Sequence, residues 1–434
     1  MQLSKIHHDR KSPAPVRVIF ISDTARNGGP GRSLHAILSH LDPRRVHRTV
    51  LLPRPGAVSD LLDRDGVADE ILFEPQWIEN VFEPWTRQMA RADFEAPAPL
   101  RWLRSGGNAA RMAAAVARTA ARVRAGGYGL LYCNGTVADI VGGLVAHLTG
   151  VPALWHVRYT SLPAPVRPLH RWLATSGAVR RIVCVSTAAT CMVAGSTGKI
   201  AVINNGVDTD AFAPGVSGYG TLRGALGLTP DTVIFGSHGR VLRRKGFLEL
   251  VQAVRRAADR MSIAERRSCH FVVVGDTPQD FRPDHVAECR ALATSLGVGD
   301  QISFVGFKAD VRPYVDDFDV AVVPSVYPDP LPRAVIEAMA LGKPVVAYDV
   351  GGVREMLSHG TGTLLPRPGD ADDLAEALLR YLRDPALRAR QGRAARRHAV
   401  AHFGARAHGA RIEREIMEAV AVPSPAAPGF RSPW

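Results

Sequence analysis

The sequence predicts an α/β protein that is built from two doubly wound, Rossmann-like domains. Short, almost continuous apolar runs alternate with helical stretches along the chain, a pattern typical of parallel sheets with helices on both faces. The chain has 434 residues, which is too long for one ordinary core, so the runs are expected to form two sets. The Gly- and Pro-rich segment 213–220 (APGVSGYG) separates the two sets and is typical of a linker.

Each domain is expected to hold six strands. In the first domain, residues 15–212, the apolar runs stand at 16–22, 46–53, 129–134, 153–157, 181–186 and 200–204. In the second domain, residues 221–400, they stand at 232–237, 270–275, 301–305, 319–324, 344–348 and 362–365. A C-terminal helix is expected at 401–422, and the polar or Pro-rich ends, 1–14 and 423–434, are expected to be flexible tails.

The charge balance favours anionic partners. The chain carries 54 Lys and Arg against 41 Asp and Glu, a formal net charge of +13. Nucleic acid, an anionic membrane surface and phosphorylated small molecules all fit such a charge. Aromatic residues make up only 6% of the chain, and no run interleaves them with Lys and Arg as a base-stacking surface would. No nucleic-acid partner is therefore expected.

The cysteines and the apolar windows predict a cytoplasmic chain that does not span a membrane. Five cysteines, without C-x-x-C spacing, indicate neither a disulfide framework nor a metal ribbon, and a reducing compartment fits them. The N-terminus lacks the apolar core of a signal peptide. The most apolar long window, 135–155, contains Asp139, His147 and four glycines, so a helix followed by a strand is expected there. The acidic cluster 316–319 is expected to cap backbone groups or to be solvated.

One segment of the first domain is strongly basic. No acid occurs between Glu95 and Asp139, whereas arginines recur. On a helix spanning 108–123, Arg111, Arg118 and Arg122 would lie on one face and apolar side chains on the other. Two interpretations stay open: a solvated surface face, or a patch for anionic lipid headgroups or a lipid-linked pyrophosphate.

Two motifs of the first domain are candidates for ligand binding. In SDTARNGGPGRSLHAIL (22–38), Gly28 and Gly29 allow a close backbone approach, and a helix is expected to begin near 32–33 with its positive end toward a ligand. A plain tight turn is the alternative. PALWHVRYT places His156 and Arg158 at the C-terminal end of a strand, where open α/β sheets bind ligands. A structural histidine is the alternative there.

The second domain carries the stronger motifs. In GSHGRVLRRKGF, Gly239 ends a strand, and Arg240 and Lys245 can put two cations beside a phosphate held at a helix start. Gly275 and Gly306 end two further strands and would let a flat ring, such as a nucleobase, lie against the backbone. In PDPLPRAVIE (328–337), Asp329 precedes a helix and Glu337 stands in its second turn, so the two carboxylates do not share one helix face.

Taken together, these motifs resemble those of the family 4 glycosyltransferases of the GT-B type. The resemblance runs from Gly28 to the segment near Leu382 and is strongest in INNGVD, GRVLRRKG, ISFVGFKADV and PDPLPRAVIEAMALGKPVVAYDVGGVREML. The last stretch is similar to the family's E-x7-E signature. The resemblance implies two domains facing across a cleft. It also implies transfer of a sugar from a nucleotide-diphosphate donor with retention of configuration, and neither a metal nor another cofactor.

The resemblance also implies roles for individual residues. Asp329 would contact hydroxyls of the transferred sugar, Glu337 the ribose hydroxyls, and Arg240 and Lys245 the departing diphosphate. His156 would lie beside the reacting sugar. The donor-binding set would comprise Gly28, Gly29, Gly239, Arg240, Lys245, Gly306, Asp329, Leu331, Arg333 and Glu337, and the catalytic set His156, Arg240, Lys245 and Asp329. Arg158, Arg111, Arg118 and Arg122 are candidates for the acceptor or a membrane surface.

The implied acceptor is a polysaccharide, a glycolipid or a lipid-linked glycan, and the enzyme would work in the cytoplasm or peripherally at the inner face of a membrane. Two residues depart from the family pattern. Asp329 stands where glutamate is usual, and Pro332 stands where a small residue is common and lacks an N–H. These departures motivate an alternative: a non-catalytic nucleotide-sugar-binding subunit of a glycan-assembly complex. No side-chain nucleophile is recognisable, and a front-face transfer assisted by the departing phosphate is what the resemblance suggests.

Overall fold

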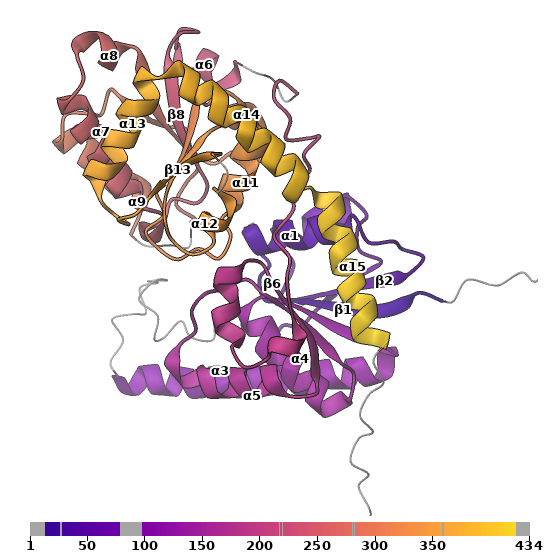
Figure 1. The fold of residues 1–434 in the computed structure, drawn as a ribbon. Coiled ribbons are helices and arrows are strands. Elements are labelled where there is room, and N and C mark those ends of the chain that lie inside the picture. The colour runs from indigo at the N-terminus through magenta and orange to yellow at the C-terminus, as the bar shows by residue number, and fades with distance from the viewer. Residues whose placement is uncertain are drawn as a thin grey trace, which may run out of the picture.

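Two parallel sheets form the frame of the molecule, one in each of two lobes (Figure 1). The computed structural model describes residues 14–26, 28–78, 98–216, 218, 220–279, 281, 283–357 and 360–421. The predicted two-domain α/β fold is confirmed. The predicted tails lie outside the described residues, apart from position 14.

The N-terminal domain holds a seven-stranded parallel sheet in the order β3-β2-β1-β4-β5-β6-β7. Its strands are β1 Val16–Ser22, β2 Val46–Leu52, β3 Glu70–Phe73, β4 Leu130–Asn134, β5 Ala153–Val157, β6 Val179–Cys184 and β7 Ile200–Val202. Its helices are α1 Gly29–Leu38, α2 Ala57–Arg64, α3 Ala98–Gly126, α4 Thr136–Thr149, α5 Arg167–Thr175, and the 3-10 turns η3 Ala164–Val166, η4 Thr187–Val193 and η5 Thr197–Lys199. The sequence reasoning missed β3, because this edge strand begins with Glu70 and is only partly buried, so it lacks a clear apolar run.

The C-terminal domain holds a six-stranded parallel sheet in the order β10-β9-β8-β11-β12-β13. Its strands are β8 Val233–His238, β9 Cys269–Val274, β10 Ile302–Phe304, β11 Val320–Val323, β12 Val345–Tyr348 and β13 Gly362–Leu365. Its helices are α6 Thr221–Leu226, η6 Arg243–Lys245, α7 Phe247–Asp259, α8 Ile263–Arg267, α9 His285–Ser295, α10 Arg312–Asp316, α11 Arg333–Ala340, α12 Val353–Met356, α13 Ala371–Arg383 and α14 Pro385–His402. The central strand β8 is buried along its whole length, which explains its continuous apolar sequence.

The order in which the chain adds strands reverses at the same place in both sheets. In one domain the chain adds β1, β2 and β3 toward one edge and then returns to pair β4 with β1. In the other it adds β8, β9 and β10 and then returns to pair β11 with β8. In open α/β sheets, ligands bind where the strand order reverses, at the carboxyl ends of the strands. The loops after β1, β4, β8 and β11 are therefore the places where a site is expected, and they hold most of the predicted motifs.

The linker is fixed to the C-terminal domain by buried carboxylates. The amide of Gly215 donates to Asp316 at 2.6 Å, and the amide of Gly220 donates to Asp317. Asp317 also accepts from the amides of Leu222 and Arg223 in α6. Capping, one of the two roles expected for this acidic cluster, is therefore what the structure shows for both carboxylates.

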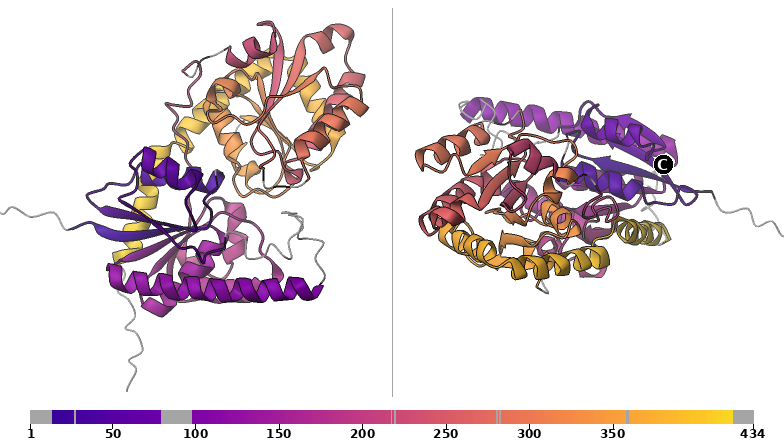
Figure 2. Two further views of the ribbon diagram at one scale, coloured as in Figure 1. Left: turned by 180° about the vertical axis from the view of Figure 1, so that it is seen from behind. Right: turned by 90° about the horizontal axis from the view of Figure 1, so that it is seen from above.

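The C-terminal helix α15 (Ala405–Ala421) belongs to the N-terminal domain. Ile412, Ile416 and Ala419 are buried in one cluster with Tyr132 and Leu154 of that domain. Both views in Figure 2 show the helix lying along this lobe after α14 has crossed from the other. The helix predicted at 401–422 thus begins at Ala405, and apolar burial decides where it docks.

The chain crosses between the lobes twice, and the two crossings touch. Val207 donates its N–H to the carbonyl of Phe403 at 2.8 Å, and Ala405 donates to the carbonyl of Val207 at 2.9 Å. Within the described part of the chain, no helix has the length and apolarity that a bilayer crossing needs.

Candidate active site

The two reversal points face each other across one cavity of about 470 Å³. The loops after β1 and β4 line it from the N-terminal domain, and the loops after β8 and β11 line it from the C-terminal domain. Ten predicted site residues meet there: Gly28, Gly29, Arg158, Gly239, Arg240, Lys245, Asp329, Leu331, Arg333 and Glu337. His156, Gly306, Arg111, Arg118 and Arg122 are not part of its lining.

Hydrogen bonds hold the two domains together around this cavity. Thr160 Oγ1 donates to the carbonyl of Pro328 at 2.5 Å, and Arg333 Nη1 donates to the carbonyl of Gly206 at 3.2 Å. On α12, the Glu355 carboxylate accepts the backbone N–H groups of residues 187 and 188 at 2.8 and 2.9 Å. The structure therefore shows the two domains in direct contact beside the cavity.

The start of α11 presents positive charge to the cavity. Pro332 is the N-cap of this helix, no side chain caps it, and its first turn contains no acid. The first N–H groups of a helix have no partner inside the helix and carry partial positive charge. Arg333 and Ala334 stand in this first turn and line the cavity. An anion can therefore bind here although Pro332 itself has no N–H.

Lys245 and Asp329 form an ion pair inside the cavity. Lys245 Nζ lies 2.6 Å from Asp329 Oδ2, and the two side chains are 24% and 21% exposed. Burial alone would raise the pKa of Asp329. The charge and hydrogen bond of Lys245, the charge of Arg244 and the amide of Leu331 outweigh burial and lower this pKa. The shorter acid thus remains ionised and reaches the cation, and the Leu331 amide is directed at Asp329 rather than left open for a ligand.

Glu337 lies at the bottom of the same cavity with two cationic or polar partners. Its Oε2 is 3.0 Å from His238 Nε2, and its Oε1 accepts from Arg333 Nε at 3.1 Å. Burial would raise the pKa of Glu337, but the His238 hydrogen bond and the Arg333 charge hold it at about 2. The described part of the chain has no group of three or more His, Cys, Asp or Glu side chains placed to hold a metal ion.

His238 is a site residue that the sequence reasoning missed. It is the last residue of β8, directly before Gly239 and Arg240, and it is almost fully buried. Its position in the sequence could have identified it, because it stands at the end of a central strand that leads into a cationic loop. Its ring fixes one oxygen of Glu337, so the other oxygen is left to Arg333 and to a ligand.

Glycines form a flat part of the cavity wall beside His238. Gly239 has a φ of +131°, which favours glycine. A side chain at Gly275 would stand only 1.8 Å from the carbonyl oxygen of Gly239. Gly306 pairs with Gly275 in an isolated bridge behind this wall, and Phe307 lines the cavity instead. Gly306 was expected in the donor site and does not line this cavity, whereas its neighbour Phe307 does.

His156 does not lie where the resemblance implied. Its side chain is fully buried and takes no part in the cavity lining. Its Nδ1 contacts the hydroxyl of Tyr132 and lies 3.2 Å from Arg158 Nη2. Burial, with the nearby charges of Arg158 and His408, lowers the pKa of His156 well below its usual value, so the ring is neutral. The residue at the cavity surface is Arg158, and His156 supports it from behind.

The basic face of α3 is partly engaged within the protein. Arg118 Nε lies 3.2 Å from a carboxylate oxygen of the fully buried Glu74, and Arg111 donates to the carbonyl of Pro75. Arg122 is half-buried. None of the three lines the cavity, so the structure separates them from the site around Arg158.

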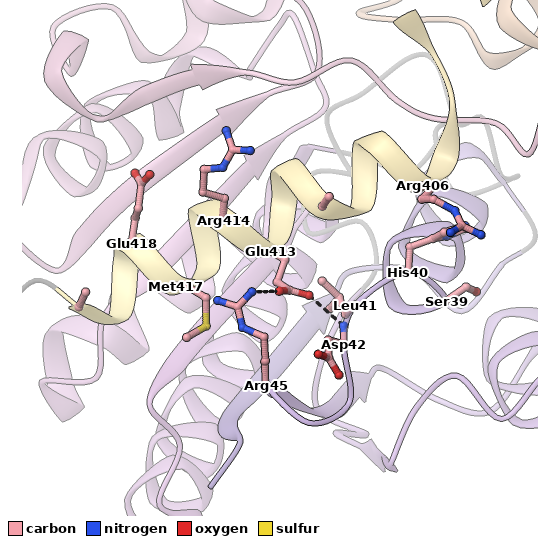
Figure 3. A pocket seen from close by; sticks show the side chains of 12 residues that line it. Ser39, His40, Leu41, Asp42, Arg45, Arg406, Glu413, Arg414, Met417 and Glu418 are labelled. Carbon is pink, nitrogen blue, oxygen red and sulfur yellow. Dashed lines mark hydrogen bonds and ion pairs between the residues drawn. The ribbon is translucent and has the colours of Figure 1, made fainter. Parts of the chain in front are cut away.

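A larger hollow of about 840 Å³ lies away from the cavity, between α15 and the end of α1. Figure 3 shows Arg45 pointing at Glu413 across this hollow. Glu413 also accepts the amide of Asp42 at 2.8 Å. These contacts join α15 to the N-terminal domain, so the hollow is part of a packing seam. The cations Arg240 and Lys245 and the start of α11, in contrast, line the cavity between the domains.

Comparisons with known proteins cover both halves of the chain. Residues 27–211 match the model described as Glycosyltransferase Family 4, and residues 220–398 match the model described as Glycosyl transferases group 1. A D-inositol 3-phosphate glycosyltransferase of Kribbella flavida is 36% identical over 206 residues, which is 46% of this chain and about half, 47%, of that protein. A 2-deoxystreptamine glucosyltransferase of Streptomyces kanamyceticus is 30% identical over 290 residues, 62% of this chain and 70% of that protein.

Solved structures show the same fold. Anabaena Alr3699/HepE in complex with UDP and glucose superposes with a TM-score of 0.74 at 23% identity, covering 93% of this chain and 99% of that one. WaaG, a glycosyltransferase involved in lipopolysaccharide biosynthesis, superposes with a TM-score of 0.67 at 15% identity, covering 91% and 98%. At these identities the likeness concerns the fold alone, and it confirms the GT-B arrangement.

Proposed function

The chain belongs to the family 4 glycosyltransferases of GT-B fold, and from this premise we propose that it moves a sugar from a nucleotide-diphosphate sugar, with retention of configuration and without a metal ion, to a glycan or lipid-linked acceptor. The observation that carries the proposal is the convergence of Arg240, Lys245 and the uncapped start of α11 on one cavity. This arrangement suits a diphosphate.

The donor is proposed to lie on the C-terminal half of the cavity. The base would lie against the flat wall at Gly239 and Gly275, and the ribose would donate its hydroxyls to Glu337. The complex of Anabaena Alr3699/HepE, a protein of the same fold, contains UDP and glucose, which supports a nucleotide donor and makes UDP the first nucleotide to test.

The reaction requires stabilisation of a leaving diphosphate. As the bond between the anomeric carbon and the phosphate oxygen breaks, negative charge grows on that oxygen. Preorganised cations and helix-terminal N–H groups stabilise such charge most strongly in an enclosed site. Lys245, Arg240 and α11 would supply them. The acceptor hydroxyl forms the new glycosidic bond, and its proton passes to the leaving phosphate oxygen on the same face of the sugar.

Asp329 and Lys245 would act as a pair. In the structure Lys245 is held by Asp329 at 2.6 Å, so the cation is already positioned before a ligand arrives. A donor phosphate would share Lys245, and the carboxylate would then accept a hydroxyl of the sugar. The contact between the domains would exclude water from the reacting sugar, which limits hydrolysis of the donor.

Nucleotide binding followed by single-turnover transfer tests the proposal. We expect UDP, GDP or ADP, and the matching sugar nucleotide, to raise the melting temperature of the intact chain, since a ligand that binds the folded state stabilises it by mass action. We expect release of the nucleoside diphosphate from the sugar nucleotide that binds, with EDTA leaving the rate unchanged. Absence of binding by every nucleotide sugar would contradict the proposed function, and loss of activity with EDTA would contradict metal independence.

One observation favours the second candidate, a non-catalytic nucleotide-sugar-binding subunit. Asp329 is already paired with Lys245, and it is one methylene shorter than the residue that the family usually has. A purified chain that binds the sugar nucleotide but shows neither hydrolysis nor transfer would favour this candidate. The Asp329→Glu variant should then still bind the sugar nucleotide and still be inactive. In an enzyme, the same substitution should change turnover.

Peripheral association with the inner face of a membrane is part of the proposal. Asp139 is the single acid between positions 98 and 207, whereas Arg and Lys recur throughout this stretch. Since Arg118 holds Glu74, the lipid-facing charges would come from exposed side chains such as Arg104 and Arg111, which stand seven positions apart on the same face of α3. Flotation with phosphatidylglycerol vesicles, but not with phosphatidylcholine vesicles, is expected. Equal flotation of an Arg104→Gln/Arg111→Gln variant would contradict the assignment of this face.

A further inference from the structure

The N-terminal half of the cavity carries charge of one sign. Arg32 of α1 and Arg158, directly after β5, line this half, and no Asp or Glu of the N-terminal domain does so among the described residues. Thr136, the first residue of α4, also lines this half, although the Asp23 carboxylate already accepts the N–H of Val137 at this helix start. The C-terminal half differs, because acids such as Asp329 and Glu337 offset its cations.

Arg158 is a half-buried cation with only neutral partners. Its Nε donates to Asn134 Oδ1 at 2.7 Å, its Nη1 to Asn205 Oδ1 at 2.6 Å, and its Nη2 contacts His156 Nδ1 at 3.2 Å. A guanidinium has five N–H donors, more than these contacts and the nearby Tyr132 hydroxyl can use. Burial lowers the pKa of Arg158 to about 10, which leaves it charged at neutral pH.

The neighbouring carboxylates do not neutralise Arg158. Asp23 accepts the amide of Val137 at the start of α4, and Asp139 accepts the hydroxyl of Tyr159 at 2.9 Å. Burial raises the pKa of Asp139 well above its usual value, so this group tends to the neutral form. No ion pair joins Arg158 to any described residue. Placing a charge in a low-dielectric site without a counter-ion is costly, and a bound anion would remove that cost.

We propose that the acceptor substrate carries a phosphate ester or pyrophosphate group, which Arg158 binds in the N-terminal half of the cavity that Arg32 also lines. This inference rests on the proposed function, because it assigns the donor diphosphate to Arg240, Lys245 and α11. With the donor diphosphate assigned to those groups, Arg158, whose hydrogen-bond partners are uncharged, is the cation that remains for the other substrate.

Rigid support for Arg158 fits a binding role. Asn134 ends β4, Asn205 belongs to the turn before the first crossing, and Tyr132 with His156 forms the layer beneath. Ser33 of α1 also donates to Asn205 at 3.3 Å. The guanidinium plane is thereby fixed, and a fixed fork binds a phosphate with two parallel hydrogen bonds better than a mobile side chain does.

The test uses the intact chain saturated with UDP, so that the donor phosphate site is filled, and calorimetric titration with inorganic phosphate. We expect phosphate to bind at millimolar concentration, and we expect Arg158→Gln to weaken this binding at least ten-fold while UDP affinity stays within two-fold. Arg171→Gln, on the exposed face of α5, is the matched control and should bind phosphate like the natural chain. Failure of UDP itself to bind would contradict the proposed function and is seen before phosphate is added.

Three results of this titration would overturn the inference: no phosphate binding to the UDP complex, equal binding by Arg158→Gln, or a parallel loss of UDP affinity in this variant. If Arg158→Gln does not fold, Arg158→Lys and Arg32→Gln replace it, and each should weaken phosphate binding several-fold. Competition then separates the sources of the group. Displacement of phosphate by glucose 6-phosphate indicates a soluble phosphorylated acceptor, and displacement by geranyl pyrophosphate a lipid-linked one. Identification of an uncharged acceptor would refute the proposal.

Discussion

Replacing Glu337 with glutamine should destabilise the protein in a way that depends on pH. The carboxylate is only 4% exposed and is held by His238 and Arg333. Its pKa is about 2 in the folded protein, against an ordinary value of 4.5. This difference corresponds to about 3 kcal/mol of stability, at 1.36 kcal/mol for each pKa unit. Glutamine has the same shape but cannot supply the charge.

The lowered pKa of Glu337 sets the direction in which stability changes with pH. Because the folded state binds the proton less tightly than the unfolded state, the contribution of Glu337 is complete above about pH 5 and is lost as the pH falls toward 2. Somewhat less than half of it should be gone at pH 3.5. Acids elsewhere in the chain titrate equally in both proteins, so the stability gap between the natural chain and Glu337→Gln reports on Glu337 together with its partners His238 and Arg333.

Urea unfolding followed by circular dichroism at pH 7, 5 and 3.5 measures the gap, and hydrogen exchange of residues 333–340 reports the local effect on α11. We expect a gap of about 3 kcal/mol at pH 7 that narrows toward pH 3.5. Glu288→Gln is the control, since Glu288 also pairs with a histidine, His285, at 2.7 Å but is 40% exposed. The Glu288→Gln variant should lose less than about 1 kcal/mol of stability. A gap that stays constant with pH would refute the role of the Glu337 charge.

Three further predictions concern turnover, domain contact and the linker. Lys245→Met should lower the single-turnover rate about 100-fold or more at saturating donor, as loss of one charge-stabilising group does, and a near-normal rate would reject its role at the leaving group. Glu355→Gln should weaken the contact with η4, so small-angle scattering of the nucleotide-bound chain should show a larger radius of gyration; an unchanged radius would argue against this contact. Asp317→Asn should cost about 2–3 kcal/mol in urea unfolding, because it leaves buried amides of α6 without a charged acceptor, and a smaller loss would mean that water replaces the carboxylate.

The donor half of the site could be predicted from sequence because its residues are close to one another along the chain. Arg240 and Lys245 share one loop, and Asp329, Arg333 and Glu337 share one loop and helix. Local spacing fixes which of them stand at a helix start, and the cavity contains all five. The interaction of Glu337 with His238 was not predictable, since the two residues are 99 positions apart.

The acceptor half depended on tertiary structure. His156 and Arg158 lie two positions apart at the end of β5, and nothing local shows which one faces the cavity. The side of the sheet that α15 covers is decided by Ile412 and Ile416, far along the chain. His408 of the same helix lies against His156, so the histidine is enclosed and Arg158 is left at the surface.

Apolar periodicity and short motifs are local properties of the chain, and they were therefore enough to predict the two parallel sheets and the family. Three features could be seen only after folding: the C-terminal helix joins the N-terminal domain, Asp329 holds Lys245, and Arg158 rather than His156 lines the cavity. These outcomes depend on burial and on charges brought together from distant positions, and their free energies exist only once the domains have packed.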